Sequence, residues 1–80
     1  MMKVRIKLFA AARERAGVEN IEILLPVNAS LSDLRVVVDQ AYPALQGMPG
    51  RWAVNHEFAS ENVAVKAGDE IAWIPPVSGG

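Results

Sequence analysis

Lys3-Val4-Arg5-Ile6-Lys7-Leu8 is the stretch that most clearly predicts part of the fold of this 80-residue chain. Its basic and apolar side chains alternate strictly, and this period of two is typical of a strand with one buried and one solvated face. The basic side chains most simply form the solvated face and do not by themselves indicate an anion site. Phe9 follows on the solvated side, where aromatic side chains are typical of interfaces.

The next segments predict a short helix and a second strand. Residues 10–16 have strong helix-forming composition, and Gly17 offers a C-terminal stop. Apolar side chains alternate in residues 20–25 until Pro26 ends the segment, as in a strand. This second strand is expected to lie antiparallel to the first.

A capping-box pattern predicts where the main helix begins. Ser30 and Asp33 have the spacing at which each side chain satisfies the other residue's amide, so the helix should start at Leu31. Tyr42-Pro43 should end it, because a residue before proline avoids helical geometry. Leu45 is expected to extend the apolar cover. The positions expected to face the sheet are Leu31, Leu34, Val37, Val38 and Ala41. Those expected to face solvent are Ser32, Arg35, Asp39 and Gln40.

The last third of the chain predicts short strands joined by turns. Residues 46–50 have the composition of a surface loop, and residues 52–54 that of a third strand. The expected turns are residues 55–57 and residues 60–62. Val63 and Val65 would form a further strand, joined to residues 70–74 by a hairpin at Gly68-Asp69.

In the final strand, Ile71 and Trp73 are expected to face inward, and Ala72 and Ile74 outward. Ile74 would then join Phe9 as an apolar residue on a solvated face. One main helix crossing a mixed sheet predicts an α+β fold, and 80 residues suffice for a single domain.

Composition excludes several kinds of function. The chain has no cysteine, so it has no disulfide, thiolate zinc site or cysteine nucleophile of its own. Eight basic and nine acidic side chains, without a basic block, argue against nucleic acid as a partner. Neither an apolar signal core nor a run near the roughly 20 residues of a membrane span occurs. These features predict a cytoplasmic protein without a membrane partner.

Internal catalytic chemistry has little support in the sequence. His56 is the only histidine, so a metal site would need several scattered carboxylates, and none is predicted. Ser60, His56 and Asp69 form a triad only on paper, because no Gly-x-Ser-x-Gly turn accompanies them. No glycine-rich phosphate loop occurs either.

The end of the chain, Pro75-Pro76-Val77-Ser78-Gly79-Gly80, is chemically unusual. Its prolines favour an extended backbone, and its glycines fit a channel too narrow for other residues. The carboxylate of Gly80 would react only after activation by another enzyme. Residues 1–74 are therefore expected to form the domain and residues 75–80 a flexible tail, which is either an insertion arm or a frayed terminus.

Residues 53–57 and 68–80, Ala-Val-Asn-His-Glu and Gly-Asp-Glu-Ile-Ala-Trp-Ile-Pro-Pro-Val-Ser-Gly-Gly, resemble the MoaD family, the small subunits of molybdopterin synthase. Further matching segments are Leu8-Phe9-Ala10, Arg13-Glu14 and Tyr42-Pro43-Ala44-Leu45. The resemblance implies a ubiquitin-like β-grasp fold in which the first and last strands are parallel neighbours. It would place Phe9 and Ile74 at the same end of one face, close to the tail.

The resemblance also implies a sulfur-carrier mechanism. An ATP-dependent adenylyltransferase related to ubiquitin E1 (MoeB-like) would adenylate the Gly80 carboxylate, and a desulfurase or rhodanese-type donor would supply sulfur for a thiocarboxylate. The large synthase subunit (MoaE-like) would provide the catalytic side chains that use this sulfur to build the dithiolene of the molybdenum cofactor. This chain would be a sulfur-donor subunit that binds no cofactor itself.

By the same resemblance, the tail from Pro75 and Pro76 through Val77, Ser78 and Gly79 would enter the partner's pocket, while Phe9, Phe58 and Ile74 would dock on its surface. A core position for Phe58 is an equal alternative. Arg13 would pair with an acidic partner residue, although exposed helix arginines usually contact only solvent. Trp52, Trp73 and the loop 46–51 depart from the family pattern.

Three alternatives remain open from the sequence. A sulfur carrier for thiazole formation in thiamine synthesis would share the fold and the terminal Gly-Gly. A ubiquitin-like modifier would form isopeptide bonds through Gly80. A plain binding module would carry an inert tail.

Overall fold

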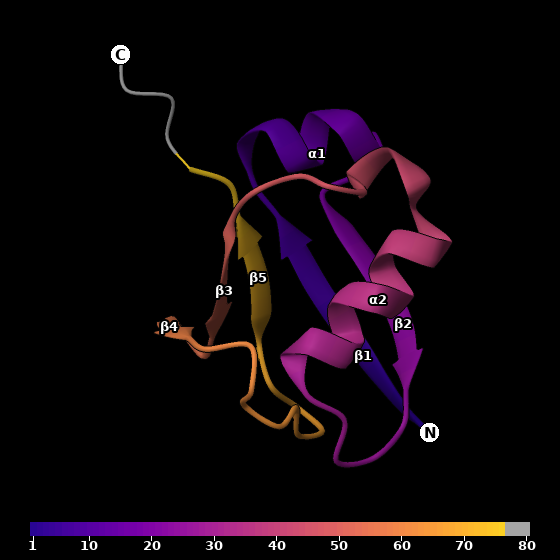
Figure 1. Ribbon diagram of the computed structural model, residues 1–80, viewed down its shortest axis with the longest axis vertical. Coiled ribbons are helices and arrows are strands. Elements are labelled where there is room, and N and C mark those ends of the chain that lie inside the picture. The colour runs from indigo at the N-terminus through magenta and orange to yellow at the C-terminus, as the bar shows by residue number, and fades with distance from the viewer. Residues whose placement is uncertain (77–80) are drawn as a thin grey trace.

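The computed structural model describes residues 1–76 of the chain and shows one mixed sheet with helices on one face and at one end (Figure 1). The strands are β1 (Met2–Leu8), β2 (Asn20–Leu25), β3 (Arg51–Val54), β4 (Glu57–Ala59) and β5 (Ile71–Ile74). The helices are α1 (Ala10–Ala16), α2 (Leu31–Ala41) and a short 3₁₀ turn, η1 (Pro43–Leu45). The strand order is β2-β1-β5-β3-β4.

The first half of the chain folds as its residue pattern predicts. β1 and β2 pair antiparallel, and Gly17 caps α1 in a left-handed conformation with a φ of 77°. α2 begins at Leu31 behind a complete capping box, in which Ser30 Oγ accepts from the Asp33 amide at 3.2 Å. The Ser30 amide in turn donates to Asp33 Oδ2 at 3.0 Å.

α2 crosses the face of the sheet and closes the core against β1 and β2 (Figure 1). The largest fully buried side chains come from these elements: Ile6, Leu8, Ile21, Leu25, Leu31 and Leu34. Leu45 is buried beside them, as expected. Ala41 was expected in the same face but is exposed, because it is the last residue of α2, where the chain turns away.

The prediction for residues 63–70 was wrong. No strand forms at Val63 and Val65, so there is no hairpin with β5; instead β5 lies between β1 and β3. The segment hydrogen-bonds to the chain around the start of α2, where the Val65 amide donates to the Ala29 carbonyl at 2.8 Å. The Leu31 amide donates to the Val63 carbonyl at 3.0 Å. Val65 is buried by these contacts.

The strand β4 was not predicted from the sequence. Asn55 and His56 form a two-residue turn with φ values of 51° and 71°, after which Glu57–Ala59 pairs with β3. None of the helices among residues 1–76 is long and apolar enough to cross a membrane.

Candidate functional site

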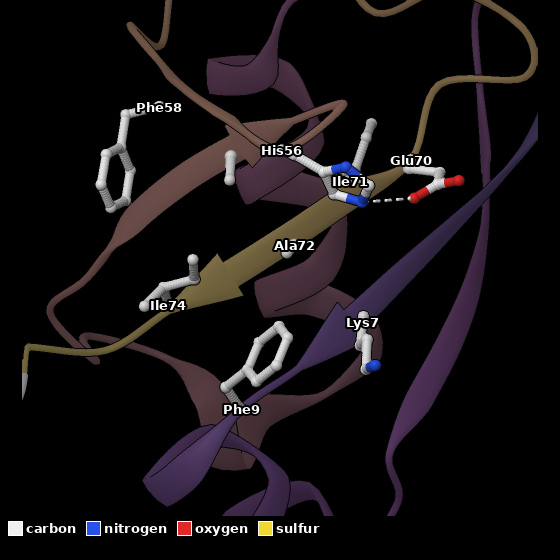
Figure 2. Close-up of a pocket in the computed structure, with 9 residues that line it drawn as sticks. Lys7, Phe9, His56, Phe58, Glu70, Ile71, Ala72 and Ile74 are labelled. Carbon is white, nitrogen blue, oxygen red and sulfur yellow. Dashed lines mark ion pairs between the residues drawn. The ribbon is translucent and has the colours of Figure 1, made fainter.

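Phe9 and Ile74 meet at the end of the parallel strand pair. Leu8 of β1 is the register partner of Trp73 of β5, so the next residue of each strand lies at the same end of the sheet. Phe9 is 38% exposed and Ile74 is half-buried, and both line a hollow of about 260 Å³ on the outer face of the sheet (Figure 2).

Phe58 lines the same hollow from the opposite side. It belongs to β4, opposite Ala53 of β3, and is 55% exposed. Phe58 therefore lies on the surface, and the alternative of a core position for it was wrong. We call Phe9, Phe58 and Ile74 the apolar surface; Figure 2 shows the two rings on either side of Ile74.

Each ring of the apolar surface carries a cation. Lys7 Nζ lies 5.3 Å from the centre of the Phe9 ring, and Arg51 Cζ lies 3.8 Å from that of Phe58. Such contacts keep the rings and the long basic side chains together at the surface. Sequence reasoning placed Lys7 on the solvated face but missed Arg51, since its partner ring belongs to a strand that was not predicted.

Pro75 and Pro76 continue the chain directly from Ile74 of the apolar surface. Pro75 is buried and Pro76 is exposed. Two further hollows flank Ile74 and these prolines, one lined by Phe58 and the other by Phe9. The predicted division into residues 1–74 and 75–80 stays a prediction, because Val77, Ser78, Gly79 and Gly80 lie outside the described residues. Within residues 1–76, packing extends as far as Pro75.

Arg13 lies apart from this arrangement. It is exposed on α1 and lines none of the three hollows around Ile74 formed by the described residues, whereas its neighbour Glu14 lines one of them. Its proposed pairing with a partner stays a prediction.

His56 and Asp69, which a catalytic triad with Ser60 would require, each pair with other residues. His56 Nε2 lies 3.0 Å from Glu70 Oε2, and both side chains are exposed. Asp69 accepts from Asn55 Nδ2 at 3.1 Å and from the Lys66 amide at 2.8 Å. Residues 1–76 contain no group of three or more side chains placed to hold a metal ion.

The structural role of Asn55 was not predicted from the sequence. Its Oδ1 accepts from the Glu70 amide at 3.0 Å, while its backbone amide donates to the Glu70 carbonyl at 2.8 Å. These bonds fasten the segment before β5 to the β3–β4 turn and so help to place β5.

Comparison with known proteins agrees with this geometry. The ThiS family profile matches residues 6–80, nearly the whole chain. The chain belongs to the ThiS family. The molybdopterin synthase sulfur carrier subunit of Chlamydomonas reinhardtii is 37% identical over 83 residues, covering 99% of this chain and 100% of that protein.

Two solved structures extend the comparison of this ThiS-family chain. The crystal structure of small archaeal modifier protein 1 from Haloferax volcanii has a TM-score of 0.88 and 33% identity, covering 98% of this chain and 99% of that one. A chain in the complex of subunits 1 and 2 of molybdopterin-converting factor from Helicobacter pylori 26695 has a TM-score of 0.70 and 28% identity, covering 99% and 100%. The expected ubiquitin-like β-grasp fold and the resemblance to the MoaD family are confirmed.

Proposed function

We propose that this chain is the sulfur carrier subunit of a molybdopterin synthase. The observation that carries the proposal is the similarity to sulfur carrier subunits over the full chain, with a family match that continues to Gly80. The apolar surface at the root of the tail supports it, because a carrier must dock on its partner beside the group that it delivers.

The reactive group in this proposal is the carboxylate of Gly80. Its oxygen attacks the α-phosphate of ATP, so that pyrophosphate leaves and an acyl adenylate forms. The persulfide sulfur of the donor then attacks the carbonyl carbon, and AMP leaves with its bonding electron pair. A thiol reduces the acyl disulfide that forms, so that the thiocarboxylate is released while the thiol is oxidised to a disulfide. The resulting thiocarboxylate sulfur is a better nucleophile than the oxygen it replaces.

Other proteins supply the remaining chemistry. An E1-like adenylyltransferase consumes the ATP, a desulfurase or rhodanese-type protein supplies sulfur, and the large synthase subunit provides the catalytic side chains. This chain binds no cofactor in the proposed cycle, which runs in the cytoplasm. A large-subunit partner is supported by the similarity to the H. pylori complex.

The terminal residue gives the direct test. Removing Gly80, or appending one residue after it, displaces the reactive carboxylate without touching residues 1–76. A reconstituted synthase assay should then lose sulfur transfer, while circular dichroism and thermal melting stay as in the wild-type chain. Full activity of either variant would overturn the proposal.

A second candidate function is protein modification through Gly80. The similarity to small archaeal modifier protein 1, with a TM-score of 0.88, favours it specifically. A ladder of heavier conjugates on a blot of the native host, lost when Gly80 is removed, would support this second function. The two functions share the adenylation step and are not exclusive.

A further inference from the structure

Two buried tryptophans meet on the inner side of the sheet, next to the start of the tail. Trp52 and Trp73 are register partners in the antiparallel pair β3–β5, and both are buried. Their ring centres lie 4.8 Å apart at an interplanar angle of 68°, an edge-to-face contact. Trp73 directly precedes Ile74, so contacts that hold Trp73 in place also restrict the position of Ile74 and the start of the tail.

Arg35 holds Trp73 from the helical side of the sheet. Its guanidinium carbon lies 4.4 Å from the centre of the Trp73 ring. Its Nη2 donates to the carbonyls of Leu45 at 3.1 Å and Met48 at 2.9 Å, and its Nε donates to Asp39 Oδ1 at 3.0 Å. The expectation that Arg35 faces solvent was wrong: its side chain is 22% exposed. A planar guanidinium can stack and donate in several directions at once.

The loop that contains Met48 and Gly50 accepts a hydrogen bond from Arg35 and lies against Trp73 and Ile74. Met48 is buried, although its segment was predicted as a surface loop. Two residues later, a Cβ at Gly50 would lie 2.7 Å and 2.8 Å from Trp73 ring atoms and 2.9 Å from the Ile74 carbonyl oxygen. These distances are too short for any side chain, so Gly50 brings its backbone against both residues.

We propose that Arg35, Trp73 and Gly50 form a brace that fixes the direction in which Ile74 and Pro75 leave the domain. Arg35 and Gly50 contact Trp73 on the inner side of the sheet, whereas the side chain of Ile74 belongs to the apolar surface on the outer side. Ile74, Pro75 and the docking surface are thereby presented to a partner as one pre-ordered unit, which lowers the ordering cost of binding. Its role in docking rests on the proposed function; its effect on the free chain does not.

Arg35→Met tests the brace, because methionine keeps much of the aliphatic bulk but loses the fork of donors. ¹⁵N relaxation of the full free chain should show the order parameter of the Ile74 amide falling from about 0.85 to below about 0.6. The amides of β2 should not change. Gly50→Ala should give the same result by displacing the Trp73 ring, and Arg35→Met keeps the test open if Gly50→Ala fails to fold.

The control separates a local effect from lost stability. Ile23→Val shortens a side chain buried in β2, away from the brace, and lowers stability through the core. An unchanged Ile74 order parameter in Arg35→Met, or an equal fall in Ile23→Val, would overturn the brace.

Calorimetry with the large synthase subunit tests the role of the brace in docking. Arg35→Met should weaken binding about tenfold, and Ile23→Val should bind as the wild-type chain does. Loss of order at Ile74 with unchanged affinity would overturn the positioning role. Failure of the wild-type chain to bind would count against the proposed function, while the order parameters would still decide whether the brace exists.

Discussion

Leu8 and Trp73 are register partners in the parallel pair β1–β5. This pairing joins two segments from opposite ends of the chain and sets Phe9 beside Ile74 at the same end of the sheet. The apolar surface and the root of the tail therefore depend on a contact between residues 65 positions apart, since 73 − 8 = 65.

A carboxylate in the apolar surface should weaken docking more than it weakens the fold. Phe9→Asp and Ile74→Asp put a charge where the proposed partner contact excludes water, at a cost of about 2 kcal/mol, or roughly 30-fold in affinity. Calorimetry with the large subunit measures this loss. Val36→Asp is the matched control, because Val36 is 55% exposed on α2 and lines none of the hollows that contain Ile74. Unchanged affinity in the first two variants would refute the docking assignment.

Ser30→Ala should destabilise the domain by removing the capping box of α2. The change leaves the Asp33 amide without its side-chain acceptor, at a cost of about 1 kcal/mol, and should lower Tm by about 4–8 °C. Differential scanning calorimetry measures the shift. Ser32→Ala, at an exposed position of the same helix, should leave Tm nearly unchanged. Equal shifts for the two variants would show that the cap contributes nothing.

His56→Gly should stabilise the β3–β4 turn. The backbone of His56 has a φ of 71°, which glycine adopts without strain, and an Asn-Gly pair suits a two-residue hairpin turn. The exposed pair with Glu70 is a small loss. Urea unfolding should show a gain of up to about 1 kcal/mol. His56→Ala keeps the strain and should show no gain; a less stable glycine variant would contradict this account of the turn.

The local elements of the fold were predictable because their signals are local. Alternation defined β1 and β2, and the Ser30–Asp33 spacing defined the start of α2. The outward orientation of Phe9 and Ile74 followed from the same alternation. Their placement side by side did not, since it requires the parallel pairing of distant strands; the family resemblance supplied it.

The wrong or missing predictions concern segments whose structure depends on contacts between residues that are distant in the sequence. β4 has three residues with exposed Phe58 at its centre, so it lacks the alternation of a half-buried strand. Val63 and Val65 do alternate, but their backbone groups bond to the chain around the start of α2. Arg35 lies in a helix pattern that predicts a solvated face, and only the folded chain brings Trp73 beneath its guanidinium.

Intact-mass analysis of the chain purified from its native host, grown with ample sulfur while producing molybdenum cofactor, tests the sulfur-carrier account most directly. We expect a population heavier by the exchange of one oxygen for sulfur, localised by fragmentation to Gly80 and absent when the adenylyltransferase is deleted. Complete absence of that species under these conditions would contradict the account.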